Sequence, residues 1–211
     1  MSAWTYTLIP AFATILGAAV AAVRQPSPAV ASAIQHLAAG VLFAAIAGEI
    51  LPDLKHQQSP IAVIVGGALG VALMLLVKRL GEIAKGSAGL IVTVGIDILI
   101  DGLVLGIGFA AGAKQGLLLT GALTLEVLFL GLAVASELKQ TSGSAVRVIG
   151  IVAGLALLLP LGALLGTPIG ALPGPYLAGF FAFALVALLY LVTEELLVEA
   201  HTVPEQPWTT A

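Results

Sequence analysis

Two aspartates lie four residues apart within a long apolar segment, in the sequence GIDILIDG at 95–102. Side chains at positions i and i+4 are neighbours on a helix, so Asp97 and Asp101 share one face if this segment is helical. A third acid, Glu126, interrupts the next apolar segment. Carboxylates grouped in this way can share protons or bind a cation, and oxygen ligands suit hard divalent ions. These three residues are therefore the candidate functional site.

No basic side chain accompanies these acids, because all eight lysines and arginines fall in predicted loops or at the ends of apolar segments. A charged side chain that faces lipid costs roughly 2.5–3.5 kcal/mol on insertion scales, and two neighbouring anions also repel each other. Two states of low energy remain: protons neutralise the acids, or a cation binds between them. An ionisable cluster inside a membrane indicates a functional site. The alternative is a structural role, in which protonated acids hydrogen-bond the helices together.

The composition places these acids inside a membrane. The chain has 211 residues, of which 60% are hydrophobic and only 9% are charged, and its mean hydropathy is +1.14. A soluble domain has about 25% charged residues, so we predict a polytopic, all-α membrane protein. The chain has no cysteine, which excludes disulfides and thiolate metal sites. No basic cluster indicates nucleic-acid binding, and no nucleophile or phosphate-loop motif indicates an enzyme.

Seven apolar segments are predicted to cross the membrane, since a spanning helix needs about 20 residues. They are 4–23, 33–52, 60–77, 88–112, 116–136, 145–166 and 176–198. The first is interpreted as a span and not as a cleavable signal, because the first basic residue, Arg24, follows the apolar run. The loops are short, so we expect residues 1–211 to form a single transmembrane helical domain. Glycines four apart in GLVLG (102–106) and GFAAG (108–112) favour close helix packing.

The basic residues predict the orientation of the chain. If the N-terminus lies outside, the inner loops hold six of the eight lysines and arginines, and the outer loops hold two. The inner six are Arg24, Lys78, Arg79, Lys85, Lys139 and Arg147. The positive-inside rule therefore favours an outside N-terminus, and seven spans would leave the C-terminus inside. We expect an integral protein of a prokaryotic-type plasma membrane.

Three further acids extend the candidate site into a path across the membrane. Glu49 lies near the outer end of the second predicted span, whereas Glu194 and Glu195 lie in the inner half of the seventh. The alternative interpretation is that they are ordinary helix-end charges at the membrane interface. The histidines are predicted to be interfacial polar residues and not metal ligands, because none lies in the middle of a span. They are His36, His56 and His201.

Four segments along the chain form a recognisable series. In order, they are LAAGVLFAAIAGEILPDL (37–54), GIDILIDGLVLG (95–106), GLAVASEL (131–138) and FAFALVALLYLVTEELLVEAH (181–201). They resemble motifs of the ZIP family of divalent-metal transporters. The resemblance covers nearly the whole chain. It implies eight helices with both termini outside, so the eighth helix of the family is missing or truncated here. The outside N-terminus that it implies agrees with the orientation predicted from the charges.

The resemblance also implies a ligand set. In the family the fourth helix carries His-Asn-x-x-Asp/Glu-Gly, and here Asp97 takes the place of the histidine while Asp101 keeps the acid. Glu126 fills the first ligand position of the motif on the fifth helix. Departures from the family pattern fall at Ile98, Val127 and Leu130. One metal site with carboxylate ligands only is therefore implied, in place of the two-metal centre of some members.

Together the acids and the resemblance predict a transporter that moves a divalent metal ion towards the cytoplasm. An all-carboxylate site shifts preference from zinc towards harder ions, with Mn²⁺, Fe²⁺ and Zn²⁺ as the candidate substrates. The expected partners are the lipid bilayer and the metal ion, and the family implies a homodimer. Two alternatives stay open. One is a transport-incompetent membrane subunit or scaffold, and the other is a proton or monovalent-cation pathway through the same acids.

Overall fold

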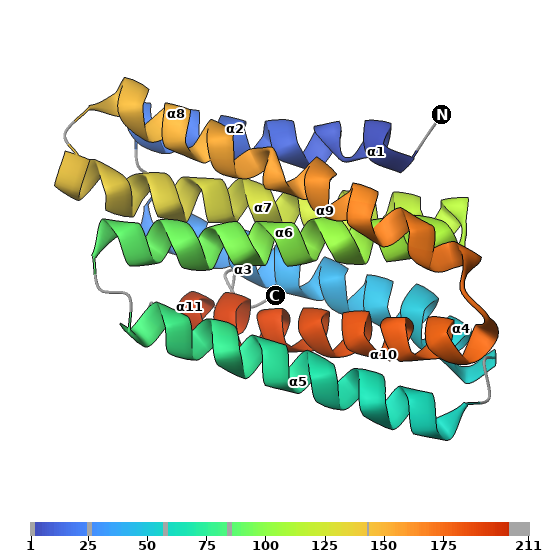
Figure 1. Ribbon diagram of the computed structural model, residues 1–211. Helices are drawn as coiled ribbons and strands as arrows, with labels where there is room; N and C mark the ends of the chain where they lie inside the picture. The colour runs from blue at the N-terminus through green and yellow to red at the C-terminus, as the bar shows by residue number, and fades with distance from the viewer. Residues whose placement is uncertain (1–2, 25–26, 57–58, 84–85, 143, 203–211) are drawn as a thin grey trace.

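The computed structural model describes residues 3–24, 27–56, 59–83, 86–142 and 144–202. Within these ranges the regular structure is helical, and long helices lie side by side, joined at the two ends of a bundle (Figure 1). The elements are α1 (Ala3–Tyr6), α2 (Leu8–Val23), α3 (Pro28–Ala45), η1 (Ile46–Ile50), α4 (Leu51–His56), α5 (Pro60–Ile83), α6 (Ser87–Ala111), α7 (Ala113–Ser142), α8 (Ala145–Ala156), α9 (Leu158–Gly166), η2 (Thr167–Ala171), α10 (Gly174–Tyr190), η3 (Leu191–Leu196) and α11 (Leu197–Ala200). The prediction of an all-α chain is confirmed for the described residues.

Among the described residues, six helical segments are long and apolar enough to cross a membrane. They are Pro28–Gly48, Pro60–Ile83, Ser87–Ala111, Ala113–Thr141, Ala145–Ala171 and Gly174–Leu196. Each overlaps one of the last six predicted spans. The first predicted span, 4–23, differs because its main helix α2 has 16 residues, fewer than the roughly 20 that a spanning helix needs. The structure supports six of the seven predicted spans, and the span at 4–23 stays a prediction.

Two prolines set the breaks between α1 and α2 and between α8 and α9. The break residues are Thr7 and Leu157, and both have φ −69° and ψ −17°. Each lies just before a proline-containing turn, formed around Pro10 or Pro160. Proline has no N–H to donate to the carbonyl four residues earlier, so the hydrogen-bond ladder is interrupted there. Because the break residues keep helical backbone angles, the chain continues as a second helix and does not turn back.

Helix α6 occupies the centre of the bundle and packs against both α7 and α9 (Figure 1). Glycines permit the close approach of α6 and α9. A Cβ at Gly102 would collide with the carbonyl of Leu159, and one at Gly162 would collide with the carbonyl of Leu99. The close packing predicted for GLVLG (102–106) is thus confirmed, whereas the glycines of GFAAG face side chains from the start of α7.

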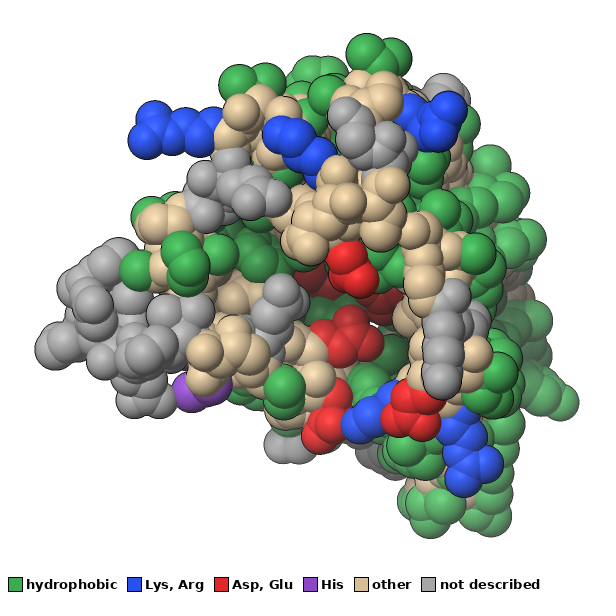
Figure 2. All heavy atoms as spheres, turned by 90° about the vertical axis from the view of Figure 1, so that its left-hand side faces the viewer, with side chains coloured by type: hydrophobic (Ala, Val, Ile, Leu, Met, Phe, Trp, Pro, Cys, Tyr) green, Lys and Arg blue, Asp and Glu red, His purple; other side chains and the backbone are tan. Residues whose placement is uncertain are grey.

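Basic side chains gather at one end of the bundle, where α2, α5 and α7 end and α8 begins (Figure 1, left). We call this the basic end. Its described lysines and arginines are Arg24, Lys78, Arg79, Lys139 and Arg147. Figure 2 looks onto this end and shows Lys and Arg side chains around its edge. The side of the membrane that the basic end faces stays a prediction from the positive-inside rule.

Candidate metal centre

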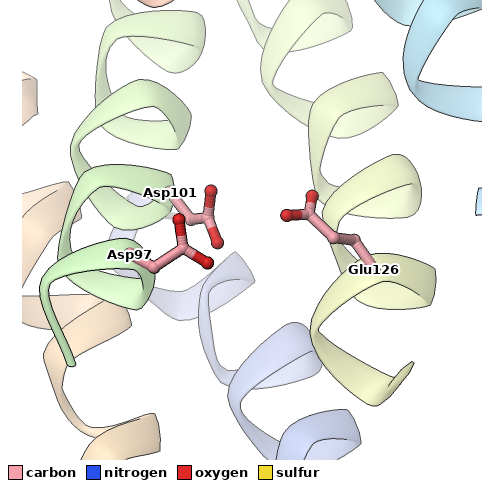
Figure 3. A group of neighbouring side chains, drawn as sticks. All are labelled: Asp97, Asp101 and Glu126. Atoms are coloured by element: carbon pink, nitrogen blue, oxygen red, sulfur yellow. The ribbon is translucent and has the colours of Figure 1, made fainter. Parts of the chain in front are cut away.

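Asp97, Asp101 and Glu126 converge between α6 and α7 (Figure 3). The two aspartates lie one turn apart on α6, and Glu126 points towards them from α7. One carboxylate oxygen of each residue lies within 4.8 Å of those of the other two. All three residues are buried, with exposed fractions of 5%, 1% and 2% in the order named. The structure therefore brings together the three acids that the sequence singles out.

The local fold explains why these acids meet. Helices α6 and α7 are antiparallel neighbours joined at a single residue, Gly112, so residues at similar distances from this turn lie at similar depth. Each helix also rests against another backbone. Gly102, next to Asp101, contacts α9, and a Cβ at Gly131 of α7 would collide with the carbonyl of Thr14 on α2. The two acid-bearing helices are thus held in place by contacts that leave no room for a side chain.

The three acids have no basic partner, since no lysine, arginine or histidine in the described ranges forms an ion pair with them. Asp101 Oδ2 and Glu126 Oε2 are buried, and neither has a hydrogen-bond partner among the described residues. A buried polar atom without a partner costs about 1–3 kcal/mol, and more if the group is charged. Three ionised carboxylates in contact would also repel one another. The arrangement therefore requires protons or a bound cation.

The spacing of the oxygens suits a single ion. Oxygen ligands lie about 2.0–2.6 Å from Mg²⁺ or Ca²⁺, so ligands on opposite sides of one ion are about 4–5 Å apart. The oxygens of Asp97, Asp101 and Glu126, all within 4.8 Å of one another, fall inside that limit. A ligand set of oxygens alone favours hard divalent ions over copper or zinc. The geometry can accommodate one cation with carboxylate ligands.

A small cavity of about 40 Å³ lies beside the acids. Its polar lining comes from Asp97, Glu126 and Glu195, and its apolar lining from Phe129, Leu130, Ala133, Leu191 and Leu196. This volume holds roughly one or two water molecules or an ion of similar size. Figure 2 shows a hollow at the basic end with Asp and Glu side chains on its wall. The cavity, with Glu195 in its lining, thus lies on the side of the acids that faces the basic end.

The two consecutive glutamates on η3 have different environments. Glu195 lines the cavity, whereas Glu194 accepts a hydrogen bond from Lys78 Nζ of α5 at 3.2 Å. The side chains of Lys78 and Glu194 are 52% and 47% exposed, so this ion pair lies at the surface of the bundle. Of these two glutamates, Glu195 thus lines the cavity beside the acids and Glu194 does not, and the acidic path itself stays a prediction. No sequence pattern predicts the ion pair between Lys78 and Glu194, because its members belong to helices far apart in the chain.

Glu195 reaches the cavity from a π-helical stretch, Leu191–Leu196. A π-turn holds an extra residue, which redirects the side chains that follow, and such turns are frequent at functional sites. Glu49 belongs to a second π-helical stretch, Ile46–Ile50. The side chain of Glu49 lies outside the part of the chain that the structure describes, so its place in the path stays a prediction.

Comparison with known proteins assigns neither a family nor a function to this site. No protein-family model matches the chain, and no curated protein matches it. The resemblance to the ZIP family therefore still rests on the four quoted motifs and on the matching positions of Asp97, Asp101 and Glu126.

Proposed function

We propose that this protein is a membrane transporter that binds one divalent metal cation at a time between Asp97, Asp101 and Glu126. The observation that carries the proposal is a set of three buried carboxylates, with oxygens within 4.8 Å of one another and no basic partner in the described ranges. A bound cation supplies the missing positive charge. It also supplies a partner for Asp101 Oδ2 and Glu126 Oε2, the two buried oxygens that lack one.

The chemistry of the ligands supports Mn²⁺ or Fe²⁺ as the substrate ahead of Zn²⁺. Carboxylate oxygens prefer harder ions, whereas imidazole and thiolate favour zinc and copper. We assign the protein to a divergent branch of the ZIP family on its motifs. In this assignment Asp97 replaces a histidine ligand, and that replacement is what moves the preference away from zinc.

The cavity supports a direction for ion release. It lies on the side of the carboxylate site that faces the basic end, and Glu195 stands on its wall. The positive-inside rule predicts that the basic end is cytoplasmic. In this proposal the ion leaves Asp97, Asp101 and Glu126 through the cavity, and Glu195 provides the next carboxylate on its way to the cytoplasm.

Uptake of radioactive Mn²⁺ into proteoliposomes tests the proposal. Asp101→Asn keeps the size of the side chain but removes its charge, so uptake should fall at least roughly 10–100-fold, the loss seen when even the supporting groups of a metal site are removed. The matched control is Glu137→Gln, an exposed acid on α7, which should transport like the wild type. Undiminished uptake by Asp101→Asn would falsify the assignment of the site.

A proton pathway is the second candidate function, because a proton can also occupy the two buried oxygens that lack a partner. A pH-sensitive dye inside the same proteoliposomes separates the two. Proton entry in the absence of any divalent metal, abolished by Asp101→Asn, would favour the proton pathway. Wild-type protein that moves neither ion would favour the transport-incompetent subunit.

A further inference from the structure

Two histidines meet at the basic end, outside the carboxylate site. His36 lies on α3 and His201 directly follows α11, and their ring centroids are 5.0 Å apart with an interplanar angle of 63°. The hydroxyl of Ser32 donates a hydrogen bond to the carbonyl of Ala200 at 2.9 Å, which fixes α3 to α11 next to these rings. The fold therefore builds this pair from two distant parts of the chain.

Hydrogen bonds to backbone carbonyls fix which nitrogen of each ring carries the proton. His36 Nδ1 lies 2.9 Å from the carbonyl of Ser32, and His201 Nδ1 lies 2.6 Å from the carbonyl of Leu197. A carbonyl oxygen only accepts, so Nδ1 is the donor in both rings. The lone pair of each neutral ring is then on Nε2. Metal-binding histidines use this same arrangement, with one nitrogen held by a carbonyl and the other on the metal.

His36 Nε2 is buried, and it has no hydrogen-bond partner among the described residues. A buried polar atom in this state calls for an explanation, such as an ion. The distance between the two imidazole rings fits a metal ion bound between them. With metal–nitrogen bonds of about 2.0–2.1 Å and tetrahedral geometry, the centres of two imidazoles on one Zn²⁺ lie roughly 5 Å apart. The observed centroid separation of His36 and His201 is 5.0 Å.

We propose that His36 and His201 form a second metal site, in which the two Nε2 atoms bind one borderline divalent ion such as Cu²⁺ or Zn²⁺. Imidazole selects these ions, whereas the carboxylate site selects harder ones, so the two sites differ in preference. Only two protein ligands are assigned, and water completes the coordination shell. The site holds its ion at the basic end, the end at which the carboxylate site opens. This inference does not depend on transport.

Copper binding to the tag-free, full-length protein in nanodiscs tests the site. With Cu²⁺ below one equivalent, pulsed electron paramagnetic resonance should detect the remote nitrogens of two imidazoles on the same ion. His36→Gln and His201→Gln should each abolish the two-imidazole signal and weaken Cu²⁺ binding on the order of tenfold or more. The matched control is His56→Gln, the only other histidine in the sequence, which should leave the signal unchanged. Asp101→Asn should also keep it, because that residue belongs to the other site.

The His201 side chain is exposed, so His201→Gln should not disturb folding. This variant therefore tests the site even if His36→Gln fails to fold. Wild-type protein without an imidazole signal overturns the proposal. So does a two-imidazole signal that survives in His201→Gln, or one that disappears only in His56→Gln. Failure of metal uptake alone, with the imidazole signal intact, would count against the carboxylate transporter and not against this site.

Discussion

At the scale of single residues, we expect position 97 to have the largest influence on which ion the proposed carboxylate site prefers. Asp97 and Glu126 both line the cavity, so in the proposed transporter the ion would pass Asp97 between the hollow and the buried cluster. The ZIP family, which the chain resembles, places a histidine here. Oxygen and imidazole differ in the metals they favour, so one exchange at this position tests ligand type without moving the ligand.

Asp97→His should raise the affinity for Zn²⁺ relative to Mn²⁺ on the order of tenfold, because imidazole favours zinc more strongly than a carboxylate does. Competition calorimetry with the two ions on purified protein measures the ratio. Asp97→Asn serves as the control, since it removes the charge without adding imidazole and should weaken binding of both ions. An unchanged Zn²⁺/Mn²⁺ ratio in Asp97→His would exclude Asp97 as a direct ligand.

At the scale of helices, the apolar runs predicted where most helices lie but not where they begin and end. The second predicted span begins at 33, whereas α3 begins at Pro28, because the side chain of Ser27 accepts a hydrogen bond from Val30 N and caps the helix. The third predicted span ends at 77, whereas α5 continues to Ile83. Polar residues stop an apolar run but do not stop a helix, so hydropathy underestimates both lengths.

Other features of the site could not be predicted from sequence patterns. The convergence of Asp97, Asp101 and Glu126 followed from helical spacing and depth, which are local properties. The ion pair between Lys78 and Glu194 joins residues 116 positions apart, and no local pattern encodes it. The π-helical stretch that carries Glu195 is also invisible to hydropathy, because an added residue in one turn does not change the apolar content.

Gly102→Ala should destabilise the bundle, because the new Cβ would collide with the carbonyl of Leu159 on α9. Overpacking of this kind costs about 1–3 kcal/mol. The collision also displaces α6 next to Asp101, so metal affinity should fall as well. Thermal unfolding in detergent, monitored by circular dichroism, measures the stability.

The matched control for this change is Gly121→Ala, on the exposed side of α7, where an added Cβ meets no atom within 4 Å. Alanine is a better helix former than glycine by roughly 0.5–1 kcal/mol, so this variant should be at least as stable as the wild type. Equal melting temperatures for Gly102→Ala and Gly121→Ala would contradict the close contact between α6 and α9.

At the scale of the whole molecule, the buried site and its surroundings are not symmetric along the bundle. The cavity with Asp97 and Glu195 on its wall faces the basic end, whereas Asp101 is outside the cavity lining and 1% exposed. The cavity therefore offers the proposed ion a path towards the basic end. The direction of the proposed transport then depends on which side of the membrane this end faces, and the six basic residues of the predicted inner loops predict the cytoplasmic side.

Single cysteines test that orientation, since the native chain has none and gives no background labelling. Gln140 is exposed at the basic end, and Ala171 is exposed at the opposite end, before α10, so Gln140→Cys and Ala171→Cys place one thiol at each end. A membrane-impermeant maleimide applied to intact cells should label Ala171→Cys, and it should label Gln140→Cys only after the membrane is permeabilised. The reverse labelling pattern would mean that the basic end, and with it the cavity, faces the outside of the cell. That result would refute ion release towards the cytoplasm. It would not contradict the carboxylate site, which an ion would then enter from outside.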